Sequence, residues 1–258
     1  MRNARPAVLA LAALLLAACS TNNSPGSNYK SQETESDKAA SLNKQLGTVY
    51  LRQGNLALAK EKLERAEKYN PRDPETHSVL ALLYEKLDVP EQVDEQYKMA
   101  IRLAPKNPQI INNYAVYLCK TNRADQGVKR FLEAARNPLY RTPELAYSNA
   151  GVCLREAKRY EEASNAFAHA LQIRPNFAEA MFQSADLDME RGQIAQAREQ
   201  LDKYLASYDA TADLLALGVR MARALNDRMG EEKYTRRLRI EFAGSEQLRS
   251  LDPKRNPG

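Results

Sequence analysis

The sequence repeats itself with a period of about 34 residues, and this period constrains the fold more than any other feature. Each repeat has small residues at its eighth and twentieth positions and a large residue at its twenty-fourth. The small positions are Gly47, Ala81, Ala115, Gly151, Ala185 and Gly218, then Ala59, Val93, Gly127, Ala163, Ala197 and Gly230. The large position holds Leu63, Tyr97, Phe131, Phe167, Leu201 and Tyr234. Because antiparallel helices approach closely only where side chains are small, each repeat is predicted to be a helix–turn–helix unit.

The repeats start near residues 40, 74, 108, 144, 178 and 211. A proline closes the second helix at Pro71, Pro105 and Pro175. The spacing resembles the tetratricopeptide repeat. This resemblance implies an all-α fold, a right-handed superhelical solenoid of about six repeats over residues 38–250. The alternative is a generic alanine-rich helical bundle, which the coincidence of small and large positions disfavours.

Two departures from the period are informative. The third repeat ends in the segment 137–143, Asn-Pro-Leu-Tyr-Arg-Thr-Pro, and the next repeat starts two residues late. We expect an extended connection there, held out of helix by its two prolines. The sixth repeat is the most divergent, which is expected of a terminal unit that caps a solenoid.

The N-terminal segment is predicted to be a lipoprotein signal. Arg2 and Arg5 precede an apolar run from Ala7 to Ala18, which is too short to span a bilayer comfortably. The end of this run, Leu-Ala-Ala-Cys at 16–19, resembles the bacterial lipobox, in which the cysteine is lipidated and becomes the mature N-terminus. We therefore expect a signal peptide over 1–18 and acyl chains on Cys19. The alternative is an ordinary secretory signal with a chance cysteine.

The residues after Cys19 are predicted to form a tether. Residues 20–36 contain almost no aliphatic side chain, so the lipidated cysteine and a flexible tether are assigned to 19–37, and a short tail to 251–258. Residue 20 is serine rather than aspartate. By resemblance to sorted bacterial lipoproteins, this implies a lipid anchor in the outer membrane of a Gram-negative bacterium, with the folded part facing the periplasm.

Composition argues against several classes of function. The net charge of +5 is small and scattered, which excludes nucleic acid as the main partner. His77 and His169 occupy unrelated repeat positions without metal-ligand spacing around them, and no known catalytic motif occurs. We therefore expect a chain that is not an enzyme and that uses no metal and no cofactor.

The resemblance to tetratricopeptide repeats implies a binding groove lined by the first helices. The groove residues it implies, an apolar stripe with polar flanks, are Lys44, Thr48, Leu51, Ser78, Leu82, Asn112, Val116, Val152 and Phe182. Such a surface suits an extended or helical peptide with apolar anchors. The alternative is that the apolar members pack between repeats and bind nothing.

Three motifs resemble a narrower family. Residues 112–119 (Asn-Asn-Tyr-Ala-Val-Tyr-Leu-Cys), 137–140 (Asn-Pro-Leu-Tyr) and 149–153 (Asn-Ala-Gly-Val-Cys) resemble stretches of the type IV pilus biogenesis lipoprotein family PilF/PilW. The resemblance implies a pilotin: a monomeric adaptor, escorted by the lipoprotein sorting machinery, that brings the pilus secretin subunit to the outer membrane and supports its multimerisation. The alternative is a scaffold lipoprotein for another envelope complex, such as cell-wall hydrolases.

The family resemblance also implies a disulfide between Cys119 and Cys153, because both cysteines fall in matching motifs. An oxidising periplasm would favour it. Their repeat positions, twelve and ten, point about 200° apart on ideal helices, which argues against the bond unless the longer connection rotates the fourth repeat. Two small buried thiols remain the alternative.

Overall fold

The computed structural model describes residues 34–251, and that part of the chain is entirely helical apart from its connections. Cys19 and the predicted signal peptide lie outside the described residues, as do 252–258. The helices of the first three repeats are α1 (Glu35–Arg52), α2 (Leu56–Tyr69), α3 (Pro74–Lys86), α4 (Pro90–Leu103), α5 (Pro108–Lys120) and α6 (Ala124–Ala135). Those that follow are α7 (Pro143–Glu156), α8 (Tyr160–Ile173), α9 (Ala178–Glu190), α10 (Ile194–Ser207), α11 (Ala212–Ala224), α12 (Arg228–Glu241) and α13 (Glu246–Leu251).

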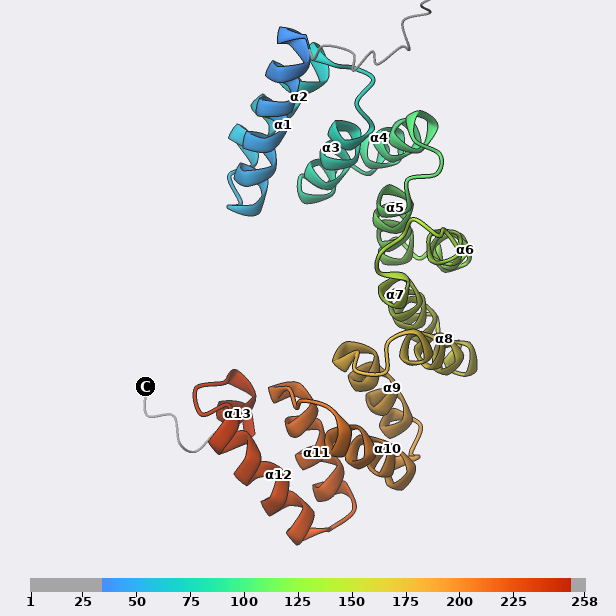
Figure 1. The fold of residues 1–258 in the computed structure, drawn as a ribbon, viewed down its shortest axis with the longest axis vertical. Helices are drawn as coiled ribbons and strands as arrows, with labels where there is room; N and C mark the ends of the chain where they lie inside the picture. The colour runs from blue at the N-terminus through green and yellow to red at the C-terminus, as the bar shows by residue number, and fades with distance from the viewer. Residues whose placement is uncertain (1–33, 252–258) are drawn as a thin grey trace, which may run out of the picture. The chain divides into compact units, whose positions relative to one another are not determined.

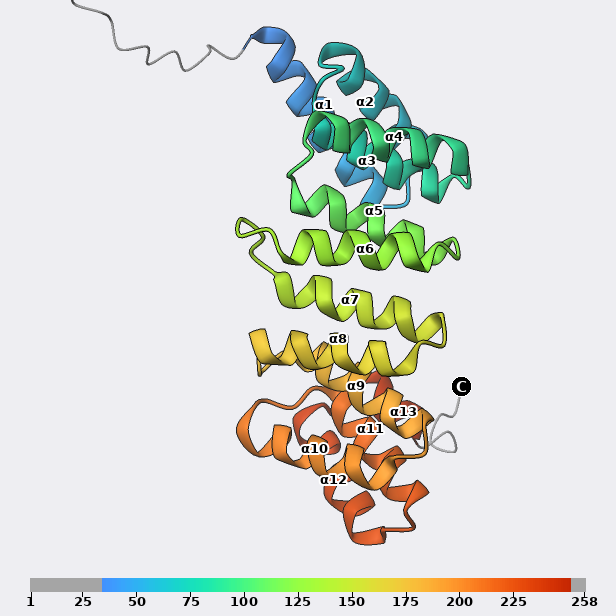
Figure 2. The ribbon, with the colours of Figure 1, turned by 90° about the vertical axis from the view of Figure 1, so that its right-hand side faces the viewer.

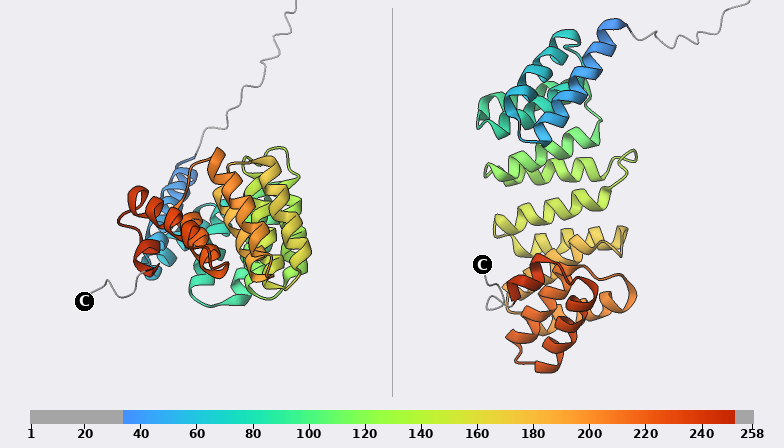
Figure 3. Two further views of the ribbon diagram at one scale, coloured as in Figure 1. Left: turned by 90° about the horizontal axis from the view of Figure 1, so that it is seen from below. Right: turned by 90° about the vertical axis from the view of Figure 1, so that its left-hand side faces the viewer.

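Odd- and even-numbered helices pair in chain order, so α1 to α12 form helix–turn–helix units (Figure 1). Each first helix also contacts the first helix of the next unit, from α1 against α3 to α9 against α11. Figure 2 shows α5, α6, α7 and α8 as successive layers, and Figure 3 shows the same stacking from the opposite side. The predicted all-α tetratricopeptide repeat fold is confirmed.

Local sequence signals set where the helices begin and turn. Asp73 and Asn107 are N-caps whose side-chain oxygens accept backbone N–H groups of the first turn, and each is followed by a proline at the first helical position. Within the repeats, the turns after α3 and α5 place Asp88 and Asn122 at φ of 56° and 59°. Such left-handed residues end helices by turning the backbone sharply.

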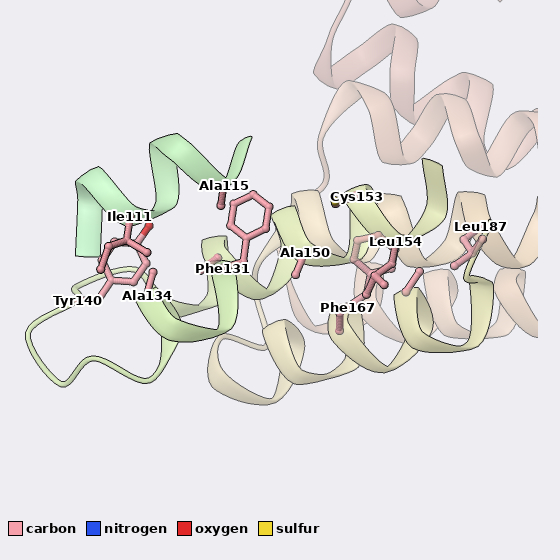
Figure 4. Packing of buried hydrophobic residues seen from close by; sticks show 13 residues of the cluster. Ile111, Ala115, Phe131, Ala134, Tyr140, Ala150, Cys153, Leu154, Phe167 and Leu187 are labelled. Carbon is pink, nitrogen blue, oxygen red and sulfur yellow. The ribbon is translucent and has the colours of Figure 1, made fainter. Parts of the chain in front are cut away.

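The recurring small residues make the close helix contacts that the period predicts. A Cβ atom on Gly47 would lie 2.6 Å from the Leu63 side chain, and one on Gly151 would lie 2.5 Å from the Phe167 ring. Phe131 and Phe167 are buried in a cluster that extends from α5 to α9 (Figure 4). The eighth and twenty-fourth positions of a repeat therefore fit each other as a small residue beside a large one.

The ends of the helical array differ from the expectation. Helix α1 begins at Glu35, so residues 35–37, which we had assigned to the tether, are helical. The sixth repeat is not the last element, because α13 packs against α11 and α12 in the place of the first helix of a next repeat. No described helix is both long enough and apolar enough to cross a membrane.

Candidate binding groove

A cavity of about 540 Å³ opens between the first helices of the first three repeats, α1, α3 and α5. Four of the predicted groove residues line it: Lys44 and Thr48 from α1, and Ser78 and Leu82 from α3. Its other walls come mainly from Gln45, Val49, Arg52, Glu75, Val79, Asn107, Gln109, Ile110 and Asn113. The N-terminal part of the predicted row therefore forms a hollow with apolar walls and a polar rim.

Lys44 is fixed at the rim by two carboxylates of the next repeat. Its Nζ lies 3.0 Å from Oδ2 of Asp73 and 2.7 Å from Oε2 of Glu75. Burial lowers the pKa of Lys44, but the hydrogen bonds and charges of Glu75 and Asp73 outweigh burial and raise it. The ammonium group stays charged and already paired, so the exposed cation left in the cavity wall is Arg52.

The other predicted groove residues lie in contacts between helices. Asn112 is buried and accepts a hydrogen bond from the Asn149 side chain at 3.4 Å. Val116 and Val152 pack against the core cluster that contains Phe131 and Phe167. Phe182 packs against the cluster around Leu201, and Leu51 packs against the cluster around Leu63. From the third repeat onward, the predicted row therefore serves mostly to join repeats.

The sequence analysis missed Val49, a cavity residue whose side chain is 45% exposed. Val49 stands at the tenth position of its repeat, and the equivalent Leu83 and Leu187 are fully buried. Those positions pack against the preceding repeat, and no repeat precedes α1 among the described residues. Val49 is therefore exposed at a repeat position that is buried in other repeats. The sequence feature that could have identified it is its place in the first repeat of the series, not a motif.

The groove face of the later repeats is polar and internally paired. Arg155 of α7 contacts Asp186 and Glu190 of α9, each at 2.8 Å, and Arg220 of α11 pairs with the same Asp186. Burial lowers the pKa of Arg155, but the hydrogen bonds and charges of Asp186 and Glu190 raise it overall. These ion pairs join successive first helices, so the apolar part of the groove lies in the first repeats.

Cys119 and Cys153 form a disulfide that joins α5 to α7, with their Cα atoms 5.6 Å apart. They are 34 residues apart in the sequence. The Sγ atom of Cys119 also fills the space beside Gly127 of α6. The bond links the two repeats on either side of the extended connection, whose Tyr140 is buried in the core cluster (Figure 4).

The two histidines lie apart and make structural contacts. His77 is buried: its Nε2 lies 2.9 Å from the Pro71 carbonyl oxygen, to which it donates, and its Nδ1 contacts the Gln96 side chain at 2.6 Å. His169 is exposed on α8, where its ring lies 5.4 Å from that of Tyr147. Within residues 34–251, no group of His, Cys, Asp or Glu side chains could hold a metal ion.

The sequence of this chain is similar to those of known proteins. Residues 44–108 and 154–221 each match a tetratricopeptide repeat family. Over 241 residues, the chain is 28% identical to the type IV pilus assembly protein PilF of Pseudomonas aeruginosa, covering 93% of this chain and 95% of that one. The chain is a tetratricopeptide repeat protein that is homologous to PilF.

Solved structures of the PilF/PilW family agree with this assignment. The structure of Pseudomonas aeruginosa PilF superposes with a TM-score of 0.65 and 26% identity, covering 86% of this chain and 100% of that one. PilW, described as a widely conserved type IV pilus biogenesis factor, superposes with a TM-score of 0.66 and 28% identity, covering 83% of this chain and 98% of that one. Each superposition covers the whole, or nearly the whole, of the solved PilF or PilW chain.

Proposed function

We propose that this PilF homologue is a pilotin: an outer-membrane lipoprotein, anchored through Cys19, that binds the type IV pilus secretin subunit and supports its localisation and multimerisation. Homology to PilF and PilW supports the broader role in type IV pilus biogenesis. The observation that carries the binding step is the cavity between α1, α3 and α5. In this proposal, the lipid anchor localises the protein to the outer membrane, and the cavity binds a segment of the secretin.

The cavity has the properties of a peptide-binding site. Val49, Val79 and Leu82 supply apolar wall, and none of the three is fully buried. Asn107, Gln109 and Asn113 surround it with amide groups that can hydrogen-bond an extended backbone. A secretin segment with one or two apolar side chains would bury those walls without rearranging the repeats.

The proposal is tested by placing a charge in the cavity wall without disturbing the core. Val49→Glu suits this test because the side chain is 45% exposed, so the new carboxylate stays hydrated in the free protein. We expect detergent-solubilised secretin to bind this variant at least about 10-fold more weakly, since an apolar anchor would desolvate the charge. The melting temperature should stay at the parent value.

Met229→Glu is the matched control. Met229 is 84% exposed at the start of α12, remote from the cavity lining. It tests whether an added negative charge alone weakens binding. If Val49→Glu and Met229→Glu bind secretin as tightly as the parent, the cavity is not the docking site.

A further inference from the structure

Exposed apolar side chains gather along one edge of the described helical array. We call it the inter-repeat edge; it comprises the connections 70–73, 104–107, 136–142, 174–177, 208–211 and 242–245 with the helix ends that flank them. Large apolar residues exposed there are Tyr69, Leu139, Leu145, Ile173, Tyr208 and Ile240. The opposite edge, formed by the turns within repeats, exposes Leu225 and Met229, and the others of this kind among residues 34–251 lie on α1. The asymmetry needs an explanation.

Leu139 is held outward by its own connection. It is 79% exposed, while the next residue, Tyr140, is buried in the core. The Asn137 side-chain oxygen accepts the Leu139 N–H at 2.9 Å, and the Asn137 amide donates to the Lys106 carbonyl at 2.8 Å. The exposed leucine is therefore fixed in place and is not the tip of a loosely held loop.

The connections along this edge contact their neighbours. Asn137 joins the connection 136–142 to 104–107. Arg174, at the end of α8, lies 3.4 Å from Glu144, in the first turn of α7. A shallow cavity of about 510 Å³ lies between the connections 174–177 and 208–211. Figure 2 shows the connections after α4, α6, α8 and α10 on the same side of the helical array, so their residues follow one edge of it.

Cations without ion-pair partners lie on the same edge. Arg72, Lys106, Arg136 and Arg141 make no ion pair within the described part of the chain, and their connections are exposed. On the opposite edge, Arg123 pairs with Asp94, Arg159 with Asp125 and Glu162, and Arg191 with Glu161. Exposed cations that make no ion pair within the described residues also lie there: Arg52, Lys86, Lys158 and Arg228. Both edges therefore carry unpaired cations, and the inter-repeat edge differs from the opposite edge in combining them with more of the exposed large apolar side chains.

Some acidic groups of this edge are paired with cations, whereas Glu179 and Asp213 make no ion pair within residues 34–251 and accept hydrogen bonds from Gln183 and Gln247. Glu75 pairs with Lys44, and Glu144 pairs with Arg174. Asp209 is the exposed carboxylate of the connections that makes no ion pair within residues 34–251. The edge thus presents apolar and aromatic side chains among cations, which is the composition of surfaces that lie on anionic membranes.

The chain enters the helical array at this edge. Ser36 Oγ donates to the Tyr69 carbonyl at 2.9 Å, and the Asn70 side chain donates to Asp37 at 3.3 Å, so the start of α1 lies beside the end of α2. Cys19 precedes Glu35 by 16 residues. Such a segment spans at most about 58 Å when fully extended. An anchor at Cys19 would hold the start of α1, and with it the N-terminal end of this edge, within that distance of the lipid.

We propose that the inter-repeat edge rests on the phospholipid surface to which the Cys19 anchor attaches the protein. This inference depends on the lipid anchor of the proposed function. Leu139 and Ile173 enter the boundary between headgroups and acyl chains, while Tyr69 and Tyr208 lie at headgroup level, where aromatic side chains with a polar tip are favoured. The unpaired arginines contact lipid phosphates.

Tryptophan fluorescence tests the proposal directly, because the chain contains no tryptophan. The full lipidated protein is reconstituted into vesicles of phosphatidylethanolamine and phosphatidylglycerol with brominated acyl chains, which quench nearby indole rings. Leu139→Trp and Ile173→Trp report the inter-repeat edge, and Met229→Trp is the control on the opposite edge. We expect several-fold stronger quenching for the first two variants than for the control.

Vesicle flotation of the same samples separates the anchor from the orientation. Vesicle-bound protein with equal quenching at all three positions would overturn the orientation and leave the anchor standing. Protein that does not float would overturn both. If Leu139→Trp is unquenched on lipid alone but its emission shifts to the blue when solubilised secretin is added, the edge is a protein contact and the membrane proposal is wrong.

Discussion

The Sγ atom of Cys119 lies 2.3 Å from the position that a Cβ atom on Gly127 would take, closer than two such atoms can approach. Other repeats place Ala59, Ala163 or Ala197 at this point of the second helix without difficulty. Gly127 is therefore more than one of the recurring small residues. It makes room for the disulfide that joins α5 to α7.

Gly127→Ala should destabilise the protein, although alanine is the better helix former. The new methyl group would overlap the sulfur and approach the Ala115 carbonyl oxygen to 3.0 Å. We expect the free energy of unfolding, measured by urea denaturation under oxidising conditions, to fall by about 1 to 3 kcal/mol. In a Cys119→Ala, Cys153→Ala background, the same substitution should cost clearly less. Equal costs in both backgrounds would show that the sulfur does not set the need for glycine.

Reduction of the disulfide should weaken the middle of the array. The bond closes a loop of 34 residues, for which chain entropy gives about 3 to 4 kcal/mol of stabilisation. We expect denaturant unfolding with a phosphine reductant to show a loss of this order. The Cys119→Ala, Cys153→Ala variant controls for the reductant itself, since its stability should not change. A parent protein equally stable with and without reductant would contradict the prediction.

Asp73 should make stability sensitive to acid. Burial raises the pKa of Asp73, but hydrogen bonds from Thr76 and Lys44 and the charge of Lys44 outweigh burial, so its pKa lies below the ordinary value of 3.8. A carboxyl whose pKa is lower in the folded state stabilises the fold above its unfolded pKa, and this contribution is lost as the pH falls below about 4.

The matched test is Asp73→Asn, which keeps an N-cap side chain on α3 but removes the charge. We expect its free energy of unfolding to fall less than that of the parent between neutral pH and acid. Asp209→Asn serves as control, because Asp209 is exposed in a connection. If the acid dependence of Asp73→Asn matches the parent, the pair with Lys44 does not contribute.

Cys19→Ala should release the protein from the membrane without altering the repeats. Two or three acyl chains anchor stably, and the substitution removes their attachment point. We expect the variant to be soluble or retained as precursor, with an unchanged circular dichroism spectrum and melting temperature. Outer-membrane fractionation as strong as that of the parent would contradict the lipoprotein assignment.

The sequence period predicted the paired helices because small and large residues recur at fixed spacing, as Gly47 with Leu63 and Gly151 with Phe167 illustrate. Helix α13 was not expected, since a six-residue helix is too short to show a period. It carries Leu248 and Leu251 against the cluster that contains Leu215 and Val219. A repeat pattern identifies units that have neighbours on both sides and says little about the last element.

The groove was predicted less completely for a related reason. The repeat positions identify side chains on first helices, but the twist between units decides which of them stay open. Lys44, Thr48 and Leu82 line the cavity. Phe182 stands at the same repeat position as Lys44 but packs between helices. Val49 is 45% exposed, whereas Leu83 and Leu187, at the same repeat position, are buried in clusters that include the preceding repeat.

The two ends of the array also differ in how they should melt. Helix α11 has neighbours on both sides, α9 and α13. Among the described residues, α1 has a following neighbour only, and Leu42, Leu46 and Val49 are exposed on it. In an array stabilised by nearest-neighbour interfaces, the unit with the fewest interfaces opens first. Heating should therefore fray this protein from its N-terminal repeat, with the disulfide between α5 and α7 stopping the opening midway along the chain.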